Sequence, residues 1–420
     1  MLKQLILENW KSFRYAELPL DPLTVLIGTN ASGKSNVVEA LEFLQRIAQG
    51  ENIEAALAGD KTLASIRGGV DWAARKPESQ FTLKVLVQGE DENTDYLYVI
   101  QTQTLPEVRV IKEYIEPRNL QENSELEQLK ALTIKNTIFY TKSGLKSVEP
   151  SFDFSDLKQF GQYDSIGNLQ KKKEFFNFFN NVYLPLKTNI SIVVLSSLEK
   201  TFILNPIPSK MRDYSQLSET LESDASNIAG VLAALSDQQK EEVESALSNY
   251  IKDLPEGDIK KVWAEKVGRF ARDAMLYCQE EWKTGEITEI DARSMSDGTL
   301  RFLAILTALL TRPEGSQLVI EEIDNGLHPS RAKLLVKILR EIGSKRNIDI
   351  LITTHNPALL DALGPEIVPF VVVAHRDSET GESKLTILEE IDNLPLLLAS
   401  GSLGKLATKG TIEKSLSENK

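Results

Sequence analysis

The sequence predicts an α/β fold, because short β-branched apolar runs alternate with segments of helical periodicity. Three observations support this prediction: a glycine-rich loop between a strand and a helix, an alternating pair of strands after it, and dense strand–helix alternation in the last third. The 420 residues suffice for two or three ordinary domains, or for one large unit with insertions. The hydrophobic fraction of 41% is enough for a packed core.

A phosphate-binding loop follows the short apolar strand at residues 24–27. Residues 28–35 fit the pattern G-x-x-x-x-G-K-[ST], and an apolar stripe at helical spacing (Val37, Ala40, Leu41 and Leu44) comes next. The N–H groups at the start of that helix favour an anion. The loop therefore predicts binding of a nucleoside triphosphate by Asn30, Ala31, Ser32, Gly33, Lys34, Ser35 and Asn36. Lys34 is expected to reach the β- and γ-phosphates, and the Ser35 hydroxyl to ligate Mg²⁺.

Four further strands are predicted around this loop. Residues 2–7 form a strand and residues 8–14 turn into a second one, while 81–87 and 96–102 alternate as an antiparallel hairpin. This hairpin is expected to pack beside the nucleotide-binding sheet. Residues 1–115 are therefore predicted to form an N-terminal lobe that contains the phosphate loop.

The middle of the chain has a weaker pattern. Residues 116–189 contain charged helical pieces and short aromatic runs, which predict a mostly helical insertion. A continuous apolar run at 190–195 predicts a strand, which opens a C-terminal lobe of residues 190–395. Helices are expected at about 227–235 and 239–251. Residues 396–420 form a tail, rich in Gly, Lys and Ser from residue 400 and expected to be mobile at its end.

The last third contains a second set of motifs. Ser294–Thr299 precedes a helix at 300–310 that is apolar on nearly all sides, and residues 318–322 form a buried strand that ends in two carboxylates. Leu335, Ile338, Leu339 and Ile342 form a helical stripe. The strand at 350–354 ends at His355, and further strands are predicted at 368–373 and 385–388.

Two carboxylates at the end of an apolar strand suit phosphoryl transfer to water. One holds the metal ion, and the other orients or deprotonates the attacking water. Successive residues on a strand point to opposite faces, so the two can divide these roles only where the chain begins to turn. We predict that Glu321 ligates Mg²⁺ and Glu322 acts on the water. The alternative is a solvated acidic turn.

The charge and cysteine content restrict the class of protein. The net charge of −13 disfavours a body coated with nucleic acid, although lysines 171–173 with Lys210 and Arg212 form either a local basic groove or a solvated face. The single cysteine, Cys278, is expected to be buried and favours a reducing compartment. No signal-peptide core and no apolar run of membrane-spanning length is present, which predicts a cytoplasmic protein without membrane contact.

The order of these motifs resembles an ABC-class ATPase head of the RecF/SMC type. Stand-alone and OLD-like ATPases of bacterial defence loci are more similar still, through Lys11–Phe13, Ser65–Gly69, Asn325–Pro329 and Thr354–Pro357. The resemblance covers residues 1–105 and 190–375. It implies an ABC-type P-loop NTPase head with a mixed sheet, an antiparallel subdomain and a helical lobe.

The resemblance also implies a head-to-tail homodimer, or a higher homo-oligomer, around two ATP molecules. The signature residues of one subunit (Ser296, Asp297 and Gly298) would contact the γ-phosphate bound by the other, and His355 would sense the γ-phosphate. The D-loop residues Asn325, Gly326, Leu327 and His328 would lie at the dimer seam, and Arg67 would touch the nucleotide. Two residues depart from the usual pattern: Asp297 replaces a glycine, and Glu321 stands where an aspartate is usual.

Two of the three histidines have a less specific setting. His328, next to Pro329, either contacts the second subunit or makes local hydrogen bonds in its turn. His375, beside Arg376 and Asp377, is expected at the surface.

Three functions are compatible with such an ATPase. The first is an ATP-driven switch that controls a separate effector, expected to be a nuclease, in anti-phage defence; too few residues follow His355 for the nuclease domain that OLD proteins carry there. The second is a RecF-like DNA repair clamp, which would require a basic surface and salt-sensitive DNA binding. The third and most distant is the ATPase subunit of a transporter, which the Lys-Ser-Phe and Asn-Gly-Leu-His-Pro segments disfavour.

Overall fold

The computed structural model describes residues 1–90, 94–118, 184–254, 258–283, 285–326 and 328–418. Most of the predicted helical insertion at 116–189 therefore lies outside the described residues. The chain divides into two compact units, one of residues 1–20 and 39–201 and one of residues 21–38 and 202–420. The phosphate loop belongs to the second unit, and helix α1 (Lys34–Ala48) continues from the second unit into the first.

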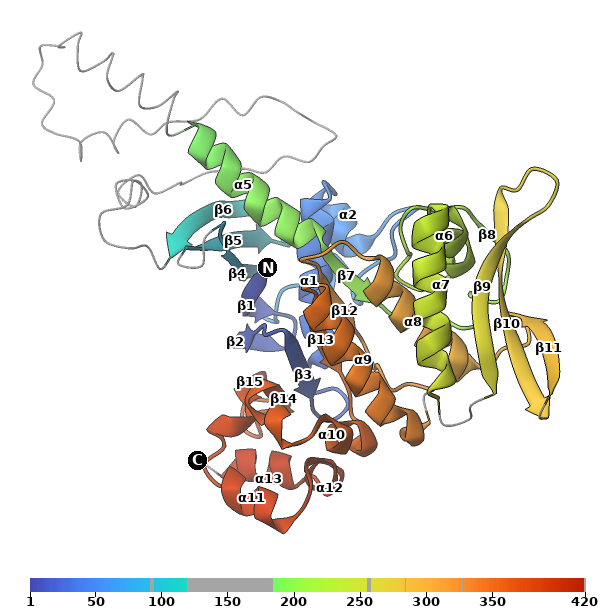
Figure 1. The fold of residues 1–420 in the computed structure, drawn as a ribbon. Coiled ribbons are helices and arrows are strands. Elements are labelled where there is room, and N and C mark those ends of the chain that lie inside the picture. Colours follow the sequence, from blue (N-terminus) through green and yellow to red (C-terminus); the bar gives the residue numbers. More distant parts are fainter. Residues whose placement is uncertain (91–93, 119–183, 255–257, 284, 327, 419–420) are drawn as a thin grey trace, which may run out of the picture. The chain divides into compact units, whose positions relative to one another are not determined.

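The first unit contains a five-stranded antiparallel sheet in the order β2-β1-β4-β5-β6 (Figure 1). The predicted hairpin is confirmed, with Phe81 opposite Thr102. The first strand is longer than expected, because Trp10 is fully buried and pairs with Phe13, which leaves only Lys11 and Ser12 for the turn. The strands are β1 (Leu2–Trp10), β2 (Phe13–Pro19), β4 (Gln80–Gln88), β5 (Asp95–Gln103) and β6 (Arg109–Arg118).

Three aromatic rings form the centre of this unit's core. The ring centroid of Trp10 lies 4.8 Å from that of Phe81 and 6.0 Å from that of Phe43, and all three side chains are almost fully buried. The edge-to-face arrangement of Trp10 and Phe81 is one that aromatic pairs prefer. These contacts fix α1 against strands β1 and β4. The short helices α2 (Ile53–Ala58) and η1 (Val70–Trp72) complete this part of the unit.

The strand predicted at residues 190–195 is wrong, because these residues lie in helix α5 (Leu184–Glu199). Ile190, Val194 and Leu198 are at most 2% exposed, whereas Ile192 is 57% exposed. Burial therefore recurs every four residues, which is the spacing of one helix face. A short β-branched run does not distinguish a strand from such a helix. The strand of this region comes later, at β7 (Thr201–Leu204).

The second unit is built on a six-stranded sheet in the order β15-β14-β3-β13-β12-β7. Strands β14, β3, β13 and β12 run parallel to one another, and β15 pairs antiparallel to β14 at the edge. Parallel strands bring their carboxyl ends to one edge of the sheet, where ligands of such folds bind. The strands are β3 (Leu23–Ile27), β12 (Gln317–Ile320), β13 (Asp349–Thr353), β14 (Val371–Arg376) and β15 (Ser383–Ile387).

A four-stranded antiparallel sheet and three helices form another layer of the second unit (Figure 1). Strand β10 pairs with β11, β9 and β8. The helices predicted at 227–235, 239–251 and 300–310 are confirmed, and Cys278 is buried as expected. The elements are α6 (Ile228–Ala234), α7 (Asp237–Lys252), α8 (Asp297–Thr311), β8 (Ser215–Gln216), β9 (Ile259–Val267), β10 (Asp273–Lys283) and β11 (Glu286–Asp291).

The C-terminal part is more helical than the sequence indicated. Residues 400–418, expected to belong to a tail that is mobile at its end, instead contain α12 and α13, whose apolar side chains Leu403, Leu406 and Ile412 are buried. The strand expected at 368–373 begins only at Val371, because a 3₁₀ helix occupies Pro365–Phe370. The remaining helices are η4 (Pro329–Arg331), α9 (Ala332–Lys345), α10 (Pro357–Leu363), η6 (Leu388–Glu390), α11 (Leu394–Ser400), α12 (Leu403–Thr408) and α13 (Thr411–Glu418).

The predicted α/β class is confirmed, with parallel and antiparallel sheets and packed helices in one chain. Within the described ranges, no helix combines the length and the apolar character that a membrane crossing requires.

Candidate nucleotide-binding site

The phosphate loop lies between β3 and α1, tightly against a neighbouring strand. Gly28 has φ +144°, and a Cβ atom there would come within 2.1 Å of the Ala374 carbonyl oxygen of β14. Gly33 has φ +115°, and Ala31 adopts the left-handed region at φ +63°. Only glycine satisfies both the space and the backbone angle at Gly28. The glycines of the motif are therefore required by the geometry of this loop.

Lys34 folds back over the loop that precedes it. Its Nζ donates hydrogen bonds to the carbonyl oxygens of Gly28 (2.6 Å) and Thr29 (3.0 Å), and the residue is only 9% exposed. Burial lowers the pKa of Lys34, while the nearby carboxylates of Glu322, Glu321 and Asp324 act to raise it. A fourth carboxylate, Glu413 of α13, acts in the same direction, so the ammonium group lies near the acidic turn after β12 and near this helix.

The two predicted catalytic carboxylates come directly after β12, where the chain turns. Glu322 has φ +46°, a strained angle for a residue with a side chain, and its N–H donates to the Thr353 hydroxyl at 2.8 Å. The N–H of Glu321 donates to the Leu204 carbonyl at 3.4 Å. Glu321 and Glu322 therefore lie in the turn after β12, where their side chains are not held to opposite faces of the sheet. This position is the one that a metal ligand and a base side by side require. Their roles as metal ligand and base stay predictions.

The turn after these carboxylates is joined to the end of β13. The buried Thr354 hydroxyl donates to Asp324 and accepts the Asn356 N–H at 3.0 Å. His355, two residues after the end of β13, is exposed and lies at the same sheet edge as the phosphate loop. Asp324 was missed by the sequence reasoning. Its position two residues after Glu322 was the available signal, but its contact with the next strand end depends on the fold.

The signature segment begins helix α8. Ser296 is the N-cap, and its hydroxyl accepts the Thr299 N–H at 3.1 Å and lies 2.8 Å from the Thr299 hydroxyl. Asp297 is exposed in the first turn. A Cβ atom at Gly298 would lie 2.8 Å from the Gly326 carbonyl oxygen. The signature and the predicted D-loop therefore pack closely within one chain.

The described D-loop residues are exposed at the surface of the second unit. Asn325 lies in a turn and Gly326 has φ +70°, while Leu327 lies outside the described residues. His328 caps the 3₁₀ helix η4, because its Nδ1 accepts the Ser330 N–H at 3.3 Å and lies 2.8 Å from the Ser330 hydroxyl. Of the two interpretations of His328, the local one has a contact. The seam contact stays a prediction.

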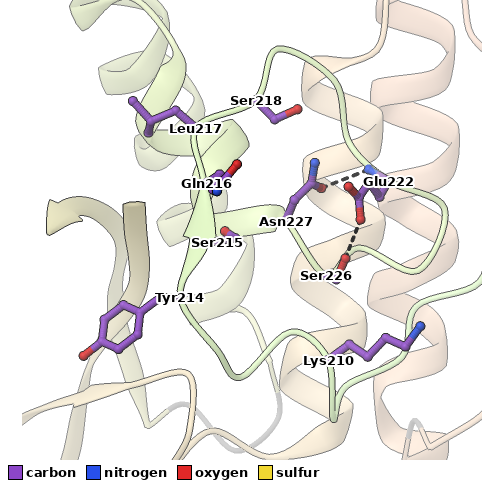
Figure 2. A pocket seen from close by; sticks show the side chains of 9 residues that line it. All are labelled: Lys210, Tyr214, Ser215, Gln216, Leu217, Ser218, Glu222, Ser226 and Asn227. Carbon is purple, nitrogen blue, oxygen red and sulfur yellow. Dashed lines mark hydrogen bonds between the residues drawn. The ribbon is translucent and has the colours of Figure 1, made fainter. Parts of the chain in front are cut away.

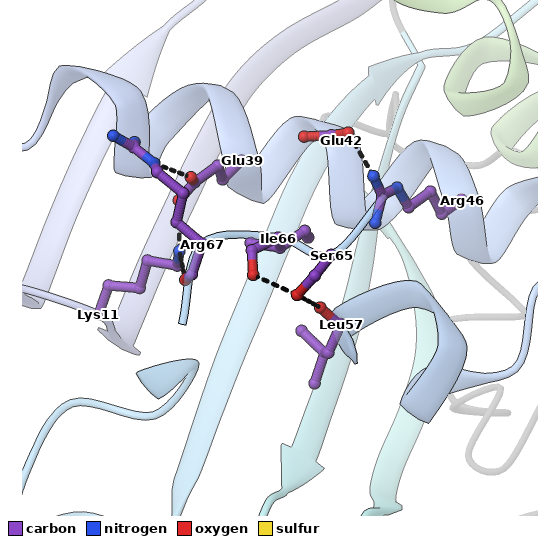
Figure 3. Close-up of polar contacts among 8 residues, drawn as sticks. All are labelled: Lys11, Glu39, Glu42, Arg46, Leu57, Ser65, Ile66 and Arg67. Carbon is purple, nitrogen blue, oxygen red and sulfur yellow. Dashed lines mark hydrogen bonds and ion pairs between the residues drawn. The ribbon is translucent and has the colours of Figure 1, made fainter. Parts of the chain in front are cut away.

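Arg67 belongs to the first unit, where it is part of an ion-pair cluster (Figure 3). Its Nε pairs with Glu39 of α1, and its carbonyl oxygen accepts a hydrogen bond of 2.8 Å from Lys11 Nζ. Lys11 also pairs with Glu39, and burial lowers the pKa of this lysine. The contact predicted between Arg67 and the nucleotide stays a prediction, since the phosphate loop lies in the other unit.

Arg376 contacts the phosphate loop and was missed by the sequence reasoning. Its Nε donates to the Ala31 carbonyl at 2.9 Å, and its Nη1 donates to the Gly381 carbonyl at 3.0 Å. Strand β14 runs parallel to β3, with Val373 opposite Ile27, so the residues after it reach the loop. The neighbouring His375, expected at the surface, is half-buried and lies 3.0 Å from the Thr386 hydroxyl through its Nε2.

The loop fits a triphosphate and its metal ion. The Ser32 hydroxyl is buried and has no hydrogen-bond partner within the described part of the chain, so the loop holds an unused donor. Such a donor, with the Lys34 ammonium and the start of α1, suits phosphate oxygens. The Ser35 hydroxyl and the Glu321 carboxylate would supply the hard oxygen ligands that Mg²⁺ prefers.

A polar pocket of about 430 Å³ lies in the same unit, around β8 and the segment before α6 (Figure 2). Its walls carry hydroxyl, amide and charged groups, and the Asn227 carbonyl oxygen accepts the Glu222 N–H at 2.9 Å. The lining residues are Lys210, Tyr214, Ser215, Gln216, Leu217, Ser218, Glu222, Ser226 and Asn227.

The phosphate loop between a strand and a helix, with an acidic turn at the same edge of the parallel sheet, defines a P-loop NTPase fold. Residues 23–361 match the family described as "AAA domain, putative AbiEii toxin, Type IV TA system", and the chain belongs to this family. Comparison with curated proteins gave no match.

Several solved structures are similar to the chain at low sequence identity. The SMC head domain from Thermotoga maritima is 14% identical, with 92% of this chain and 98% of that chain covered and a TM-score of 0.44. An Smc head bound to the C-winged helix domain of ScpA is 12% identical, with 92% and 96% covered and a TM-score of 0.49. An Smc head from Pyrococcus furiosus, bound to the C-terminal domain of ScpA, is 14% identical, with 95% and 99% covered and a TM-score of 0.47.

Proposed function

We propose that this protein binds and hydrolyses ATP with Mg²⁺, and that it acts as a switch which dimerises head to tail and controls a separate effector in anti-phage defence. One observation carries the enzymatic part. Lys34 follows β3 and the carboxylates Glu321 and Glu322 follow β12, and both strands run parallel in one sheet, so these groups lie at the same edge. A phosphate-binding lysine and two carboxylates at one sheet edge are the parts that ATP hydrolysis needs.

The same edge suggests the division of labour in hydrolysis. The loop and Lys34 hold the β- and γ-phosphates, and Ser35 and Glu321 hold the metal ion that neutralises them. Glu322 then takes a proton from the attacking water. His355, exposed at the end of β13, contacts the γ-phosphate and makes the site sensitive to its loss.

Dimerisation would complete each site. Helix α8 has 15 residues, and Ser296 and Asp297 are exposed at its N-terminal end. The N-terminal end of such a helix attracts an anion. We infer that this tip receives the triphosphate bound by a second subunit. ATP would then join two copies, and hydrolysis would release them, which is a two-state switch driven by differential binding.

The defensive role rests on the family rather than on the site. The family description names an AbiEii toxin and a Type IV TA system, which supports a role in a toxic or defensive system. Among the described residues, the groups at the carboxyl edge of the parallel sheet suit phosphoryl transfer. We therefore propose that the toxic activity belongs to a partner protein, with a nuclease as the expected class. The net charge of −13 disfavours the alternative of a RecF-like clamp that closes on DNA.

The enzymatic proposal is tested with Glu322→Gln. Removal of the base is expected to lower turnover at least about 100-fold, with ATP binding retained. Light scattering should then show a particle of twice the mass when Mg²⁺ and ATP are added. Lys34→Ala or Ser35→Ala should abolish nucleotide binding, and Ser296→Arg added to Glu322→Gln should keep binding but prevent dimerisation. Unchanged turnover in Glu322→Gln would remove Glu322 from the role of base.

The biological role is tested separately in cells. Cells that carry this gene together with its neighbouring gene should resist phage, and Lys34→Ala should remove the resistance. Tight DNA binding by the ATP-bound dimer that weakens steeply with salt would instead favour the repair clamp.

A further inference from the structure

One arginine of the second unit is connected to the signature segment by four hydrogen bonds. Arg212 lies in the turn before β8, about 80 positions away along the chain. Its Nη1 donates to the carbonyl oxygens of Ala292 (3.0 Å), Arg293 (2.9 Å) and Met295 (2.7 Å). Its Nη2 donates to the Asp297 carboxylate at 2.5 Å. One guanidinium group therefore fixes the loop that leads into α8.

These contacts bear on the departure of this signature from the usual pattern. Asp297 stands where a glycine is usual, and it places a carboxylate in the first turn of α8. There it stabilises the helix in the free protein, because a negative charge suits the positive end of the helix. The same charge would repel a triphosphate brought to that end by a second subunit.

Arg212 is the cation that directly pairs with this carboxylate. Its side chain is 27% exposed, whereas that of Asp297 is 68% exposed, so the arginine is held in place while the aspartate faces solvent. Arg301, one turn further along α8, is also close enough for Asp297 to raise its pKa, although burial lowers it. The charge of Asp297 is thus balanced from two sides, and only Arg212 also holds the preceding backbone.

We propose that Arg212 is a positioning residue of the signature: it fixes the backbone of residues 292–295 and neutralises Asp297, so that the start of α8 accepts the triphosphate bound by a second copy of the chain. This inference rests on the head-to-tail dimer proposed above. It explains how a signature with an acidic residue still serves an anionic ligand. The pair Arg212–Asp297 replaces the uncharged glycine of the usual motif.

The test measures ATP-dependent dimerisation in the Glu322→Gln background by sedimentation at increasing protein concentration. Arg212→Ala is expected to weaken the dimer about tenfold, as the carboxylate becomes unbalanced. Adding Asp297→Gly to Arg212→Ala should restore dimerisation to within about threefold of the parent. Asp297→Gly alone, which leaves the arginine charge in place, should tighten the dimer about threefold.

The matched control is Lys210→Ala, two residues away in the same turn. Within the described part of the chain, the Lys210 side chain pairs with Asp224 at 2.9 Å and not with the signature segment, so its loss should leave dimerisation unchanged. ATP binding by the monomer should be the same in every variant, since the phosphate loop is not altered. A merely structural role of Arg212 would not produce rescue by Asp297→Gly.

The outcomes separate this inference from the function on which it rests. A Glu322→Gln parent that stays monomeric with ATP overturns the proposed dimer and this inference with it. A parent that dimerises, together with an Arg212→Ala variant that dimerises equally well, overturns the inference alone. A double variant as weak as Arg212→Ala overturns the electrostatic role. If Arg212→Ala does not fold, absence of tightening in Asp297→Gly overturns that role.

Discussion

The backbone N–H of Glu322 donates a hydrogen bond of 2.8 Å to the side-chain hydroxyl of Thr353. This bond joins the turn that carries the proposed catalytic base to the last residue of β13, two residues before His355. Because Glu322 has φ +46°, its backbone needs support from the surrounding structure. Thr353 supplies part of that support from a buried position. The orientation of the Glu322 carboxylate therefore depends on a residue of the neighbouring strand β13.

Thr353→Val should lower turnover with little effect on nucleotide binding. Valine keeps the shape of threonine but leaves the Glu322 N–H without its acceptor, which costs about 1–3 kcal/mol. We expect kcat for ATP hydrolysis to fall about tenfold, because the base loses its fixed orientation. The measurement is steady-state phosphate release, with the Kd for ATP determined in parallel.

The control for this substitution is Thr307→Val in helix α8. Thr307 is fully buried and its hydroxyl has no hydrogen-bond partner in the described part of the chain, so the same exchange should be neutral or stabilising. Equal losses of turnover in the two variants would show that the Thr353 hydroxyl has no specific role.

Gly28→Ala should destabilise the second unit strongly. The added methyl group would lie 2.1 Å from the Ala374 carbonyl oxygen, at a backbone angle that alanine rarely adopts. We expect the free energy of unfolding to fall by about 3 kcal/mol or more, as judged by urea denaturation. Gly315→Ala serves as the control, because Gly315 also has a positive φ but nothing lies within 4 Å of the new atom. We expect Gly315→Ala to lower the free energy of unfolding by about 1 kcal/mol, through the backbone angle alone. The difference between the two variants would then measure the steric clash at Gly28.

Arg376→Ala should weaken ATP binding. Arg376 holds the tip of the phosphate loop through the Ala31 carbonyl, so its loss frees a segment that must be ordered around the phosphates. We expect the Kd measured by calorimetry to rise about fivefold to tenfold. Lys384→Ala is the matched control, because among the described residues the Lys384 side chain pairs with Asp377 of the same hairpin and not with the phosphate loop. If both substitutions raise the Kd for ATP equally, the effect comes from the loss of one positive charge and not from the contact with the loop.

Asp349→Asn should stabilise the protein at neutral pH but not in acid. Burial raises the pKa of Asp349 to about 6 from an ordinary 3.8, and Asp21 acts in the same direction. The folded protein therefore holds this proton more tightly, and the stability that it contributes is present below pH 3.8 and is lost as the pH rises through 6. We expect a gain of about 1–3 kcal/mol at pH 7.5, measured by urea unfolding. Asp253→Asn, at an exposed position, should show no such gain.

The segments whose structure is determined by residues close together in the chain were predictable from the sequence. The phosphate loop and its helix depend on glycine, lysine and apolar spacing within a few residues, and the buried stripe of Val37, Ala40, Leu41 and Leu44 is confirmed. The hairpin of β4 and β5 and the buried helix α8 follow from equally local patterns.

The remaining features depend on contacts between distant segments. Arg376 reaches Ala31 only because β14 pairs with β3, and nothing within the sequence around residue 376 indicates that pairing. The apolar run at 190–195 has the composition of a strand, but the partners that bury every fourth residue make it a helix. The roles of Ser296 and Arg67 depend on an assembled nucleotide site and stay predictions.

The lack of space between Gly28 and Ala374 has a mechanical consequence. Strand β14 pairs with β3, whose last residue precedes Gly28, so a shift of the β14–β15 hairpin along the sheet would displace the start of the phosphate loop. A protein that binds this hairpin would thus change the lifetime of the bound nucleotide without contacting the nucleotide. Conversely, binding of a triphosphate would change the position of the β14–β15 hairpin at the edge of the sheet, and a second protein bound there would respond to it.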